Sequence, residues 1–164
     1  MNAPIQCCVT SCDMPLDQSY WDTQWKNNTT GWDIGYASPA ITEYFNTISN
    51  KDIKILIPGC GSAYEAEWLV ANGFKHITLI DISPTAALIL EDKFKNDPSV
   101  TVLCQDFFVL NSTFDLIIEQ TFFCALKPNL RENYVAKMFG LLSEKGKIAG
   151  LLFNFPLTEV GPPF

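Results

Sequence analysis

Apolar and polar positions alternate in blocks along this chain, and the blocks predict strands that alternate with helices. Five short, mostly apolar runs have the length of buried strands: residues 53–57, 77–80, 100–103, 114–120 and 148–153. Between them, apolar residues recur at helical spacing, which predicts helices over residues 39–48, 65–71, 84–97 and 129–142. Strands that alternate with helices predict one α/β domain built on a parallel sheet.

The last helix and strand are predicted in more detail. The side chains expected to face the core from residues 129–142 are Tyr134, Val135, Met138 and Leu142. Residues 145–147, Lys-Gly-Lys, are predicted to turn the chain into the fifth strand, which Phe155 and Pro156 end.

The stretch from residue 53 to residue 81 reads as strand, glycine turn, helix and strand, which makes one βαβ unit. Gly59 and Gly61 allow a sharp turn and leave no Cβ between the backbone and a ligand. Asp81 follows Gly61 by about 20 residues, where a carboxylate can accept both hydroxyls of an adenosine ribose. The pattern predicts a nucleoside site; the alternative is a tight turn in an ordinary α/β domain.

The residues after the turn bear on which nucleoside cofactor binds. Tyr64 holds the place of the third glycine of a dinucleotide fingerprint, and Glu65 follows it. A ring and an acid disfavour a pyrophosphate, and therefore an NAD-dependent oxidoreductase. The chain also contains no P-loop string. A cofactor without phosphates, S-adenosylmethionine, fits this turn better.

Aromatic residues crowd an otherwise polar segment before the first strand. Trp21 and Trp25 are four residues apart and would share a helical face, and Trp32 and Tyr36 follow them. Indole rings in such a segment either pin a loop onto the core or form a lid over a cationic ligand such as a sulfonium. The composition leaves both interpretations open.

Polar residues also end the third and fourth predicted strands. Asp106 follows the third strand, where its carboxylate can accept from an adenine amine while Phe107 packs on the ring; an ordinary loop is the alternative. Gln120 ends the fourth strand. In open α/β folds these positions meet at the carboxyl edge of the sheet, where ligands bind.

Composition narrows the classes of partner. With 164 residues, of which 48% are hydrophobic, the chain can form one globular core. We expect a disordered leader over residues 1–15 and a single domain over residues 16–164. A net charge of −7 argues against nucleic acid and anionic membranes, and no run is apolar enough to span a bilayer. A small-molecule substrate is the expected partner.

Cysteine usage points to a reducing compartment. The six cysteines contain no CxxC pair and the chain has one histidine, His76, so neither a metal site nor a disulfide framework is predicted. Cys7, Cys8 and Cys12 fall in the leader. The first residues do not read as a charged n-region followed by an apolar h-region, so we expect no secretory signal. We therefore expect reduced thiols and a cytoplasmic location.

Several of these motifs, in unbroken order from about Tyr20 to Phe164, resemble the thiopurine S-methyltransferase family, in particular its thiol and halide methyltransferase branch. The matching segments are GWDIGYASP, ILIPGCG, LIDISP, QDFF, FDLIIEQTFFCAL and GLLFNFPLTEVGPPF. The resemblance implies a Rossmann-like class I methyltransferase fold and S-adenosylmethionine as cofactor. It implies methyl transfer to a small soft nucleophile: a thiol, a thiopurine, or a halide or thiocyanate.

The resemblance also implies roles for single residues. At the cofactor it implies that Trp21, Trp25 and Trp32 close over S-adenosylmethionine and that Gly59 lies in the turn beneath it. It implies that Asp81 binds the ribose and that Asp106 and Phe107 bind the adenine. Gln120 would lie beside the methionine moiety. In the related branch the position of Gln120 is often tyrosine. Tyr36 and Arg131 are the candidate substrate residues, and Arg131 could equally be a solvated helix charge.

The resemblance exposes one difference. Family members continue beyond GPPF with a helix and two strands, so the expected sheet has the order 3-2-1-4-5 without strands 6 and 7. The fifth strand would then be an unpaired apolar edge that invites self-association. We expect a truncated gene model, a fragment, or a protein that completes its sheet by dimerising. The alternative function is a non-catalytic S-adenosylmethionine-binding or scaffold protein.

Overall fold

The structure, a computed structural model, describes residues 15–154 and 161–164. The predicted leader lies outside the described residues except for Pro15, and with it lie Cys7, Cys8 and Cys12. Phe155 and Pro156, expected to end the fifth strand, also lie outside them.

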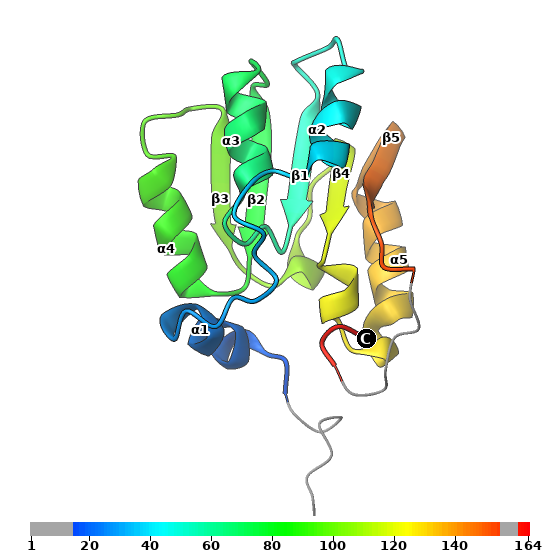
Figure 1. The fold of residues 1–164 in the computed structure, drawn as a ribbon. Helices are drawn as coiled ribbons and strands as arrows, with labels where there is room; N and C mark the ends of the chain where they lie inside the picture. The colour runs from blue at the N-terminus through cyan, green and yellow to red at the C-terminus, as the bar shows by residue number, and fades with distance from the viewer. Residues whose placement is uncertain (1–14, 155–160) are drawn as a thin grey trace, which may run out of the picture.

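A parallel sheet of five strands organises the described chain, in the order β3-β2-β1-β4-β5 (Figure 1). The strands are β1 (Lys54–Pro58), β2 (His76–Asp81), β3 (Val100–Cys104), β4 (Phe114–Gln120) and β5 (Leu142–Leu151). The helices are α1 (Gln18–Lys26), α2 (Pro39–Asn46), α3 (Tyr64–Ala71), α4 (Pro84–Lys93) and α5 (Arg131–Leu141). The predicted α/β fold and strand order are confirmed.

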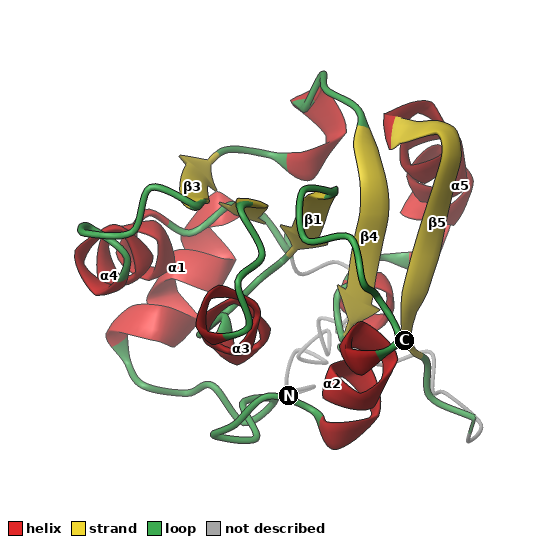
Figure 2. Ribbon diagram, turned by 90° about the horizontal axis from the view of Figure 1, so that it is seen from above, coloured by secondary structure: helices red, strands yellow, loops and turns green. Residues whose placement is uncertain are grey.

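Two hydrophobic cores lie on opposite faces of the sheet, because successive strand residues point to opposite faces. Ile55 and Ile57 of β1 pack with the helices α2, α3 and α4, whereas Leu56 packs with α5 and a short 3₁₀ helix, Phe107–Val109. Figure 2 shows α2 and α3 on one side of the sheet and α5 on the other. Covering both faces leaves the strand ends free to build a site.

In α5 the structure differs from the prediction. Tyr134, Met138 and Leu141 are buried, but Val135 is 62% exposed. A helix on one face of a sheet buries a single stripe, and residue 135 lies about 100° around the helix from residue 134. The expected inward position of Val135 is therefore wrong. Leu142, also expected inward from the helix, is instead the first residue of β5.

The fifth strand begins earlier than expected and contains a wide irregularity. Phe114 pairs with Leu142, yet Leu116 pairs with Lys147, so residues 143–146 bulge opposite Asp115. The Ser143 hydroxyl donates to Asp115 Oδ1 at 2.8 Å and fixes the bulge. The Lys-Gly-Lys sequence thus lies within the strand, not before it.

The N-terminal helix α1 is held against α4 by one carboxylate. Asp22 accepts from the Ser83 hydroxyl at 2.9 Å and from the Thr85 N–H at 2.8 Å, and its Oδ2 lies 2.6 Å from Lys26 Nζ. The Lys26 ammonium and these donors hold the pKa of the Asp22 carboxyl well below its usual range. This contact places α1 across the carboxyl edge of the sheet (Figure 1). Within the part of the chain that the structure describes, no helix has the length and apolar character needed to cross a membrane.

Candidate functional site

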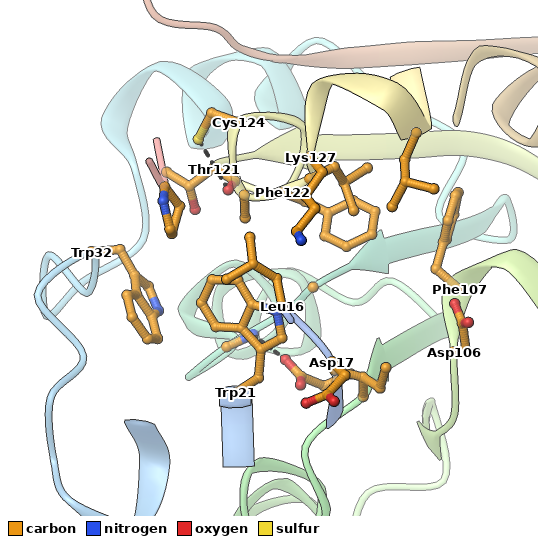
Figure 3. A pocket seen from close by; sticks show the side chains of 18 of the residues that line it. Leu16, Asp17, Trp21, Trp32, Asp106, Phe107, Thr121, Phe122, Cys124 and Lys127 are labelled. Atoms are coloured by element: carbon orange, nitrogen blue, oxygen red, sulfur yellow. Dashed lines mark hydrogen bonds between the residues drawn. The ribbon is translucent and has the colours of Figure 1, made fainter. Parts of the chain in front are cut away.

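A cavity of about 830 Å³ lies at the carboxyl edge of the sheet, where α1 crosses it. Its described lining comes from residues 15–17 and α1, residues 31–32, the ends of β1 and β2, residues 105–108, the segment from Thr121 to Leu130, and residues 153 and 162–163 (Figure 3). Most of the predicted cofactor residues are brought together in this lining: Trp21, Trp25, Trp32, Gly59, Gly61, Asp81, Asp106 and Phe107. Residues far apart in the sequence thus meet because parallel strands end at one edge.

Asp81 ends β2 with its carboxylate turned toward the glycine turn. Its Oδ2 accepts from the Gly61 N–H at 3.4 Å, and its Oδ1 accepts from the Ser83 N–H at 2.8 Å. Loss of water around this partly buried group raises the pKa of the carboxyl. Two backbone donors leave the carboxylate free to accept further hydrogen bonds from a ligand in the cavity.

The two glycines of the turn have different surroundings. Both adopt left-handed backbone angles, with φ of +56° at Gly59 and +52° at Gly61. A Cβ at Gly59 would clash with the ring of Phe122, whereas the nearest atom to a Cβ at Gly61 is Trp25 Cζ2 at 3.9 Å. The open space expected above the glycines therefore exists at Gly61, while Phe122 fills it at Gly59.

Three half-buried indoles form an aromatic wall of the cavity. Trp21 and Trp25 come from α1, and Trp32 packs edge-on against Trp21 with ring centroids 5.5 Å apart. Next to Trp32, Asp33 accepts from the Ser62 hydroxyl and from the Gly35 N–H. This aspartate anchors the loop beside the glycine turn, while the indole rings remain on the cavity.

Asp106 and Phe107 follow β3. Asp106 Oδ1 accepts from the Phe108 N–H at 2.9 Å and so caps the short 3₁₀ helix that begins at Phe107. The Phe107 ring is 4% exposed and meets Phe122 edge-on, with centroids 5.1 Å apart. The cap fixes both residues at the rim of the cavity.

Three predicted site residues lie outside the lining that the structure describes. Tyr36 is 59% exposed. Gln120 Oε1 and Arg131 Nε are buried atoms with no hydrogen-bond partner among the described residues. The Arg131 guanidinium lies over the Phe123 ring, 5.1 Å from its centroid. Unpaired buried polar atoms at the end of β4 and the start of α5 are costly without a partner.

The wall formed by residues 121–130 was not predicted from the sequence. Its apolar and soft side chains are Phe122, Cys124, Ala125, Leu126 and Leu130, and it also carries Thr121 and Lys127. Leu16 and Asp17, which begin the α1 region, also line the cavity unpredicted. Asp17 Oδ1 accepts from the Tyr20 N–H, and this cap starts the helix.

Glu119 holds the start of this wall in place. Its Oε1 accepts from the N–H groups of Phe122 and Phe123 at 3.0 and 2.9 Å, and its Oε2 accepts from the Tyr134 hydroxyl at 2.7 Å. Burial raises the pKa of the Glu119 carboxyl and, together with the nearby Glu119, that of the Tyr134 phenol. The available sequence signal was an acid directly after the apolar run Leu116–Ile118 of β4, but no neighbouring residue in the sequence indicated its hydrogen-bond partners.

The thiols of Cys60 and Cys124 lie near the site, and both are free. Burial raises the pKa of each thiol, so neither has the character of an activated nucleophile. Among the described residues, no group of three histidine, cysteine, aspartate or glutamate side chains is placed to hold a metal ion.

Comparison with known proteins gives relatives that are named as methyltransferases. The chain is 34% identical over 149 residues to a probable thiol methyltransferase 2 of Arabidopsis thaliana, covering 88% of this chain and 66% of that protein. It is 27% identical over 154 residues to thiocyanate methyltransferase 1 of Brassica oleracea, covering 91% and 68%. It is 25% identical over 165 residues to a thiopurine S-methyltransferase of Photobacterium profundum, covering 91% and 78%. The chain thus spans about two thirds of the length of the first two relatives.

Solved structures share the fold at low identity. A Burkholderia thailandensis 1,6-didemethyltoxoflavin N1-methyltransferase with bound S-adenosylhomocysteine matches with a TM-score of 0.68 and 17% identity, covering 92% of this chain and 66% of that one. A magnesium protoporphyrin IX methyltransferase of Synechocystis PCC 6803 with bound S-adenosylmethionine matches with a TM-score of 0.65 and 12% identity, covering 84% and 74%. These likenesses confirm the class I methyltransferase fold.

The sequence profile described as thiopurine S-methyltransferase matches residues 16–164. That range contains the whole cavity lining except Pro15. The chain therefore belongs to the thiopurine S-methyltransferase family.

Proposed function

We propose that this chain binds S-adenosylmethionine in the cavity at the carboxyl edge of its sheet and transfers the methyl group to a small soft nucleophile. The observation that carries the proposal is the Asp81 carboxylate, which faces the open Gly61 turn beneath an aromatic wall. The relatives are named as thiol, thiocyanate and thiopurine methyltransferases, and these names support this class of acceptor.

The residues present fit the cofactor on their own chemistry. Asp81 has acceptor capacity for the two ribose hydroxyls, and Asp106 and Phe107 offer a carboxylate and a ring edge to an adenine. The indoles of Trp21, Trp25 and Trp32 offer a wall that attracts a cation. Gln120 lies outside the described lining, but its buried Oε1, which has no hydrogen-bond partner among the described residues, offers an acceptor for an ammonium group at the end of β4. When bound, S-adenosylmethionine supplies an electrophilic methyl group on a sulfonium.

The protein's part in the reaction is alignment and exclusion of water. The wall of residues 121–130 is mostly apolar and closes one side of the cavity, with Phe122 above Gly59 and edge-on against Phe107. A thiolate or halide needs no general base, because it carries its reacting lone pair near neutral pH. The aromatic rings attract the positive charge of the sulfonium. The apolar walls exclude water, which would otherwise compete with the acceptor.

We assign the remaining predicted residues by their position. Arg131 also lies outside the described lining, but its buried Nε has no hydrogen-bond partner among the described residues, and we assign it to the acceptor side of the site on that ground. Tyr36 is exposed and outside the lining, so its proposed contact with substrate has no support in this arrangement.

Three further proposals concern the chain as a whole. Residues 16–164 form one domain, since both cores share one sheet. The chain self-associates through β5, an edge strand with Ile148 47% and Leu151 43% exposed. Analytical ultracentrifugation tests this, and a monomer at all concentrations would contradict it.

The protein is cytoplasmic, where Cys60, Cys104 and Cys124 stay reduced; subcellular fractionation tests that location.

Calorimetric titration with S-adenosylmethionine, followed by a transfer assay with labelled cofactor, tests the function. The acceptor panel holds bisulfide, thiocyanate, iodide and a thiopurine. We expect saturable binding and methylation of at least one acceptor. Binding without transfer to any of them would identify a cofactor-binding scaffold, and absence of binding would contradict the whole proposal.

A further inference from the structure

A continuous series of hydrogen bonds connects the glycine turn to helix α1. The Gly61 N–H donates to Asp81 Oδ2 at 3.4 Å, and Asp81 Oδ1 accepts from the Ser83 N–H at 2.8 Å. The Ser83 hydroxyl in turn donates to Asp22 Oδ1 at 2.9 Å. Ser83 and Asp22 are both buried, so water does not readily replace either partner. The carboxylate that ends β2 is thereby connected to the helix that carries two of the three indoles.

We propose that Asp22 and Ser83 are positioning residues of the cofactor site, which couple the Asp81 end of β2 to α1. Through this contact they hold the indoles of Trp21 and Trp25 on the cavity. The proposal rests on the function proposed above and adds the contact through which the ribose side and the aromatic side of the site depend on each other. Neither Asp22 nor Ser83 belongs to the described lining, so each acts through its neighbours.

The spacing of residues along α1 separates a cavity face from a tethered face. Residues four apart share one face of a helix, so Trp21 and Trp25 form one stripe. Gln18 and Asp22 form the neighbouring stripe. The Gln18 side-chain amide donates to the Ile82 carbonyl at 3.0 Å, close in the chain to the residues that Asp22 contacts. The first stripe therefore lies on the cavity, and the second holds the segment that directly follows β2.

The start of α4 needs the Asp22 carboxylate. The first N–H groups of a helix have no partner within the helix, and the partial positive charge there favours an anion. The Thr85 N–H donates to Asp22 Oδ1 at 2.8 Å. The Ala86 N–H donates to the Ser83 hydroxyl oxygen at 3.2 Å. A side chain of α1 thus completes α4, and separation of the two helices leaves a carboxylate and a backbone donor without their partners.

The coupling acts in both directions, because a coupling free energy between two sites is the same from either side. Loss of the Asp22 contact releases α1, and the indoles must then be ordered when a ligand binds. A ligand that contacts both Asp81 and the indoles holds α1 in place in return. Removal of the contact should therefore weaken ligand binding, and a bound ligand should protect α1 from opening.

Three variants of the full chain test the proposal: Asp22→Ala, Asp22→Asn and Thr23→Ala. Asp22→Asn changes the net charge as Asp22→Ala does, but it keeps a side-chain oxygen that accepts from the Ser83 hydroxyl and the Thr85 N–H. The Thr23 hydroxyl donates to the Ser19 carbonyl at 2.7 Å, within α1. Thr23→Ala is therefore the control for loss of a side-chain hydrogen bond in the helix itself.

Each variant is compared with the wild type in two measurements. Calorimetric titration gives the affinity for S-adenosylmethionine. Amide hydrogen exchange followed by mass spectrometry gives the opening of residues 18–26, without ligand and with S-adenosylhomocysteine, and does not depend on catalysis. A double-mutant cycle then combines Asp22→Ala with Trp21→Leu.

We expect Asp22→Ala to weaken S-adenosylmethionine binding by about tenfold and to speed exchange in residues 18–26 by a similar factor. S-adenosylhomocysteine should slow this exchange in the wild type. Trp21→Leu should weaken S-adenosylmethionine binding by about fivefold in the wild type. In the Asp22→Ala background it should weaken binding by less than about twofold, because a released indole contributes little. Asp22→Asn and Thr23→Ala should bind nearly as the wild type does.

Three results would overturn the inference: unchanged S-adenosylmethionine affinity in Asp22→Ala, an equal loss in Asp22→Asn, or additive losses in the cycle. Additive losses would mean that Asp22 only stabilises the fold and leaves the contribution of Trp21 intact. If Asp22→Ala fails to fold, Ser83→Ala replaces it, because it removes the hydroxyl that donates to Asp22 and keeps the N–H that donates to Asp81. Absence of cofactor binding by the wild type would instead refute the function on which the inference rests.

Discussion

Asp81 and Glu119 each stand near the end of a strand at the same edge of the sheet, and in both cases loss of water raises the carboxyl pKa. Asp81 lines the cavity and accepts only from backbone donors close by in the turn, so it keeps room for a ligand. Glu119 is 3% exposed and satisfied by two N–H groups and the Tyr134 hydroxyl. Asp81 thus serves ligand binding, whereas Glu119 holds the fold. The hydrogen-bond partners of each carboxylate determine this difference.

The largest effect should come from Glu119→Ala, which leaves the N–H groups of Phe122 and Phe123 and the Tyr134 hydroxyl without their acceptor. We expect the free energy of unfolding to fall by about 3–5 kcal/mol. Urea unfolding followed by circular dichroism measures it. Glu119→Gln, which keeps a carbonyl oxygen for the N–H groups, should lose far less, and Glu132→Ala, at an exposed site of α5, almost nothing. If the free energy of unfolding of Glu119→Ala fell only slightly, the proposed role of Glu119 in holding the fold would be contradicted.

Asp81→Ala should act on binding and not on folding. We expect S-adenosylmethionine affinity to fall by about 1–3 kcal/mol, because the ribose hydroxyls lose their acceptor. The free energy of unfolding should stay within about 1 kcal/mol of wild type, because Asp81 makes few contacts that hold the fold. Calorimetric titration and urea unfolding of the same preparation separate the two effects. A variant that unfolds readily but binds normally when folded would reverse the comparison.

The pH dependence sharpens the contrast at Asp81. Its pKa is raised in the folded chain, so its contribution to stability is complete below the ordinary value of 3.8 and is lost as pH rises through the folded pKa. The affinity for the cofactor changes with pH in the opposite direction and rises as pH rises through the folded pKa. The reason is that the ribose hydroxyls need the ionised carboxylate as their acceptor.

Affinity for S-adenosylmethionine should therefore decline by about tenfold per pH unit below the raised pKa. Calorimetric titrations at successively lower pH, down to the pH at which the chain begins to unfold, measure the decline. Asp81→Asn, which cannot ionise, should lack this component. Parallel curves for variant and wild type would show that another group controls binding.

The smallest effect is expected at the aromatic wall. Trp32→Leu keeps apolar volume but removes the ring face, and we expect S-adenosylmethionine affinity to drop by about 0.5–1 kcal/mol. The affinity for S-adenosylhomocysteine should fall less, because its sulfur atom carries no positive charge. Tyr36→Leu, an exposed ring of the same segment, provides the matched control and should leave both affinities unaltered. Equal losses for the two ligands would mean that Trp32 contributes packing and no attraction for the sulfonium.

The sequence predicted what local patterns determine. The unit from β1 to β2 follows from an apolar run, a glycine turn, a helical stripe and a second run, and the length of that unit places Asp81 beside Gly61. Pro39 and Pro84 mark helix starts that the structure confirms. These features depend on neighbours in the chain, so the sequence pattern is sufficient.

What the sequence could not predict depends on contacts between distant residues. The pairing of Glu119 with Tyr134 and the ring of Phe122 above Gly59 require the packed arrangement of β4 and α5. Val135 was misplaced because the apolar stripe of α5 is wider in the sequence than the face it buries. The early start of β5 results from a bulge that only the pairing partner Asp115 defines.

A crystal structure of the chain with S-adenosylhomocysteine tests the central claim most directly. The account predicts that the ribose hydroxyls lie within hydrogen-bond distance of the Asp81 carboxylate, with the sulfur beside the indoles of Trp21, Trp25 and Trp32. Density for the ligand at another surface, or an Asp81 carboxylate turned away from a ligand bound in this cavity, would contradict it.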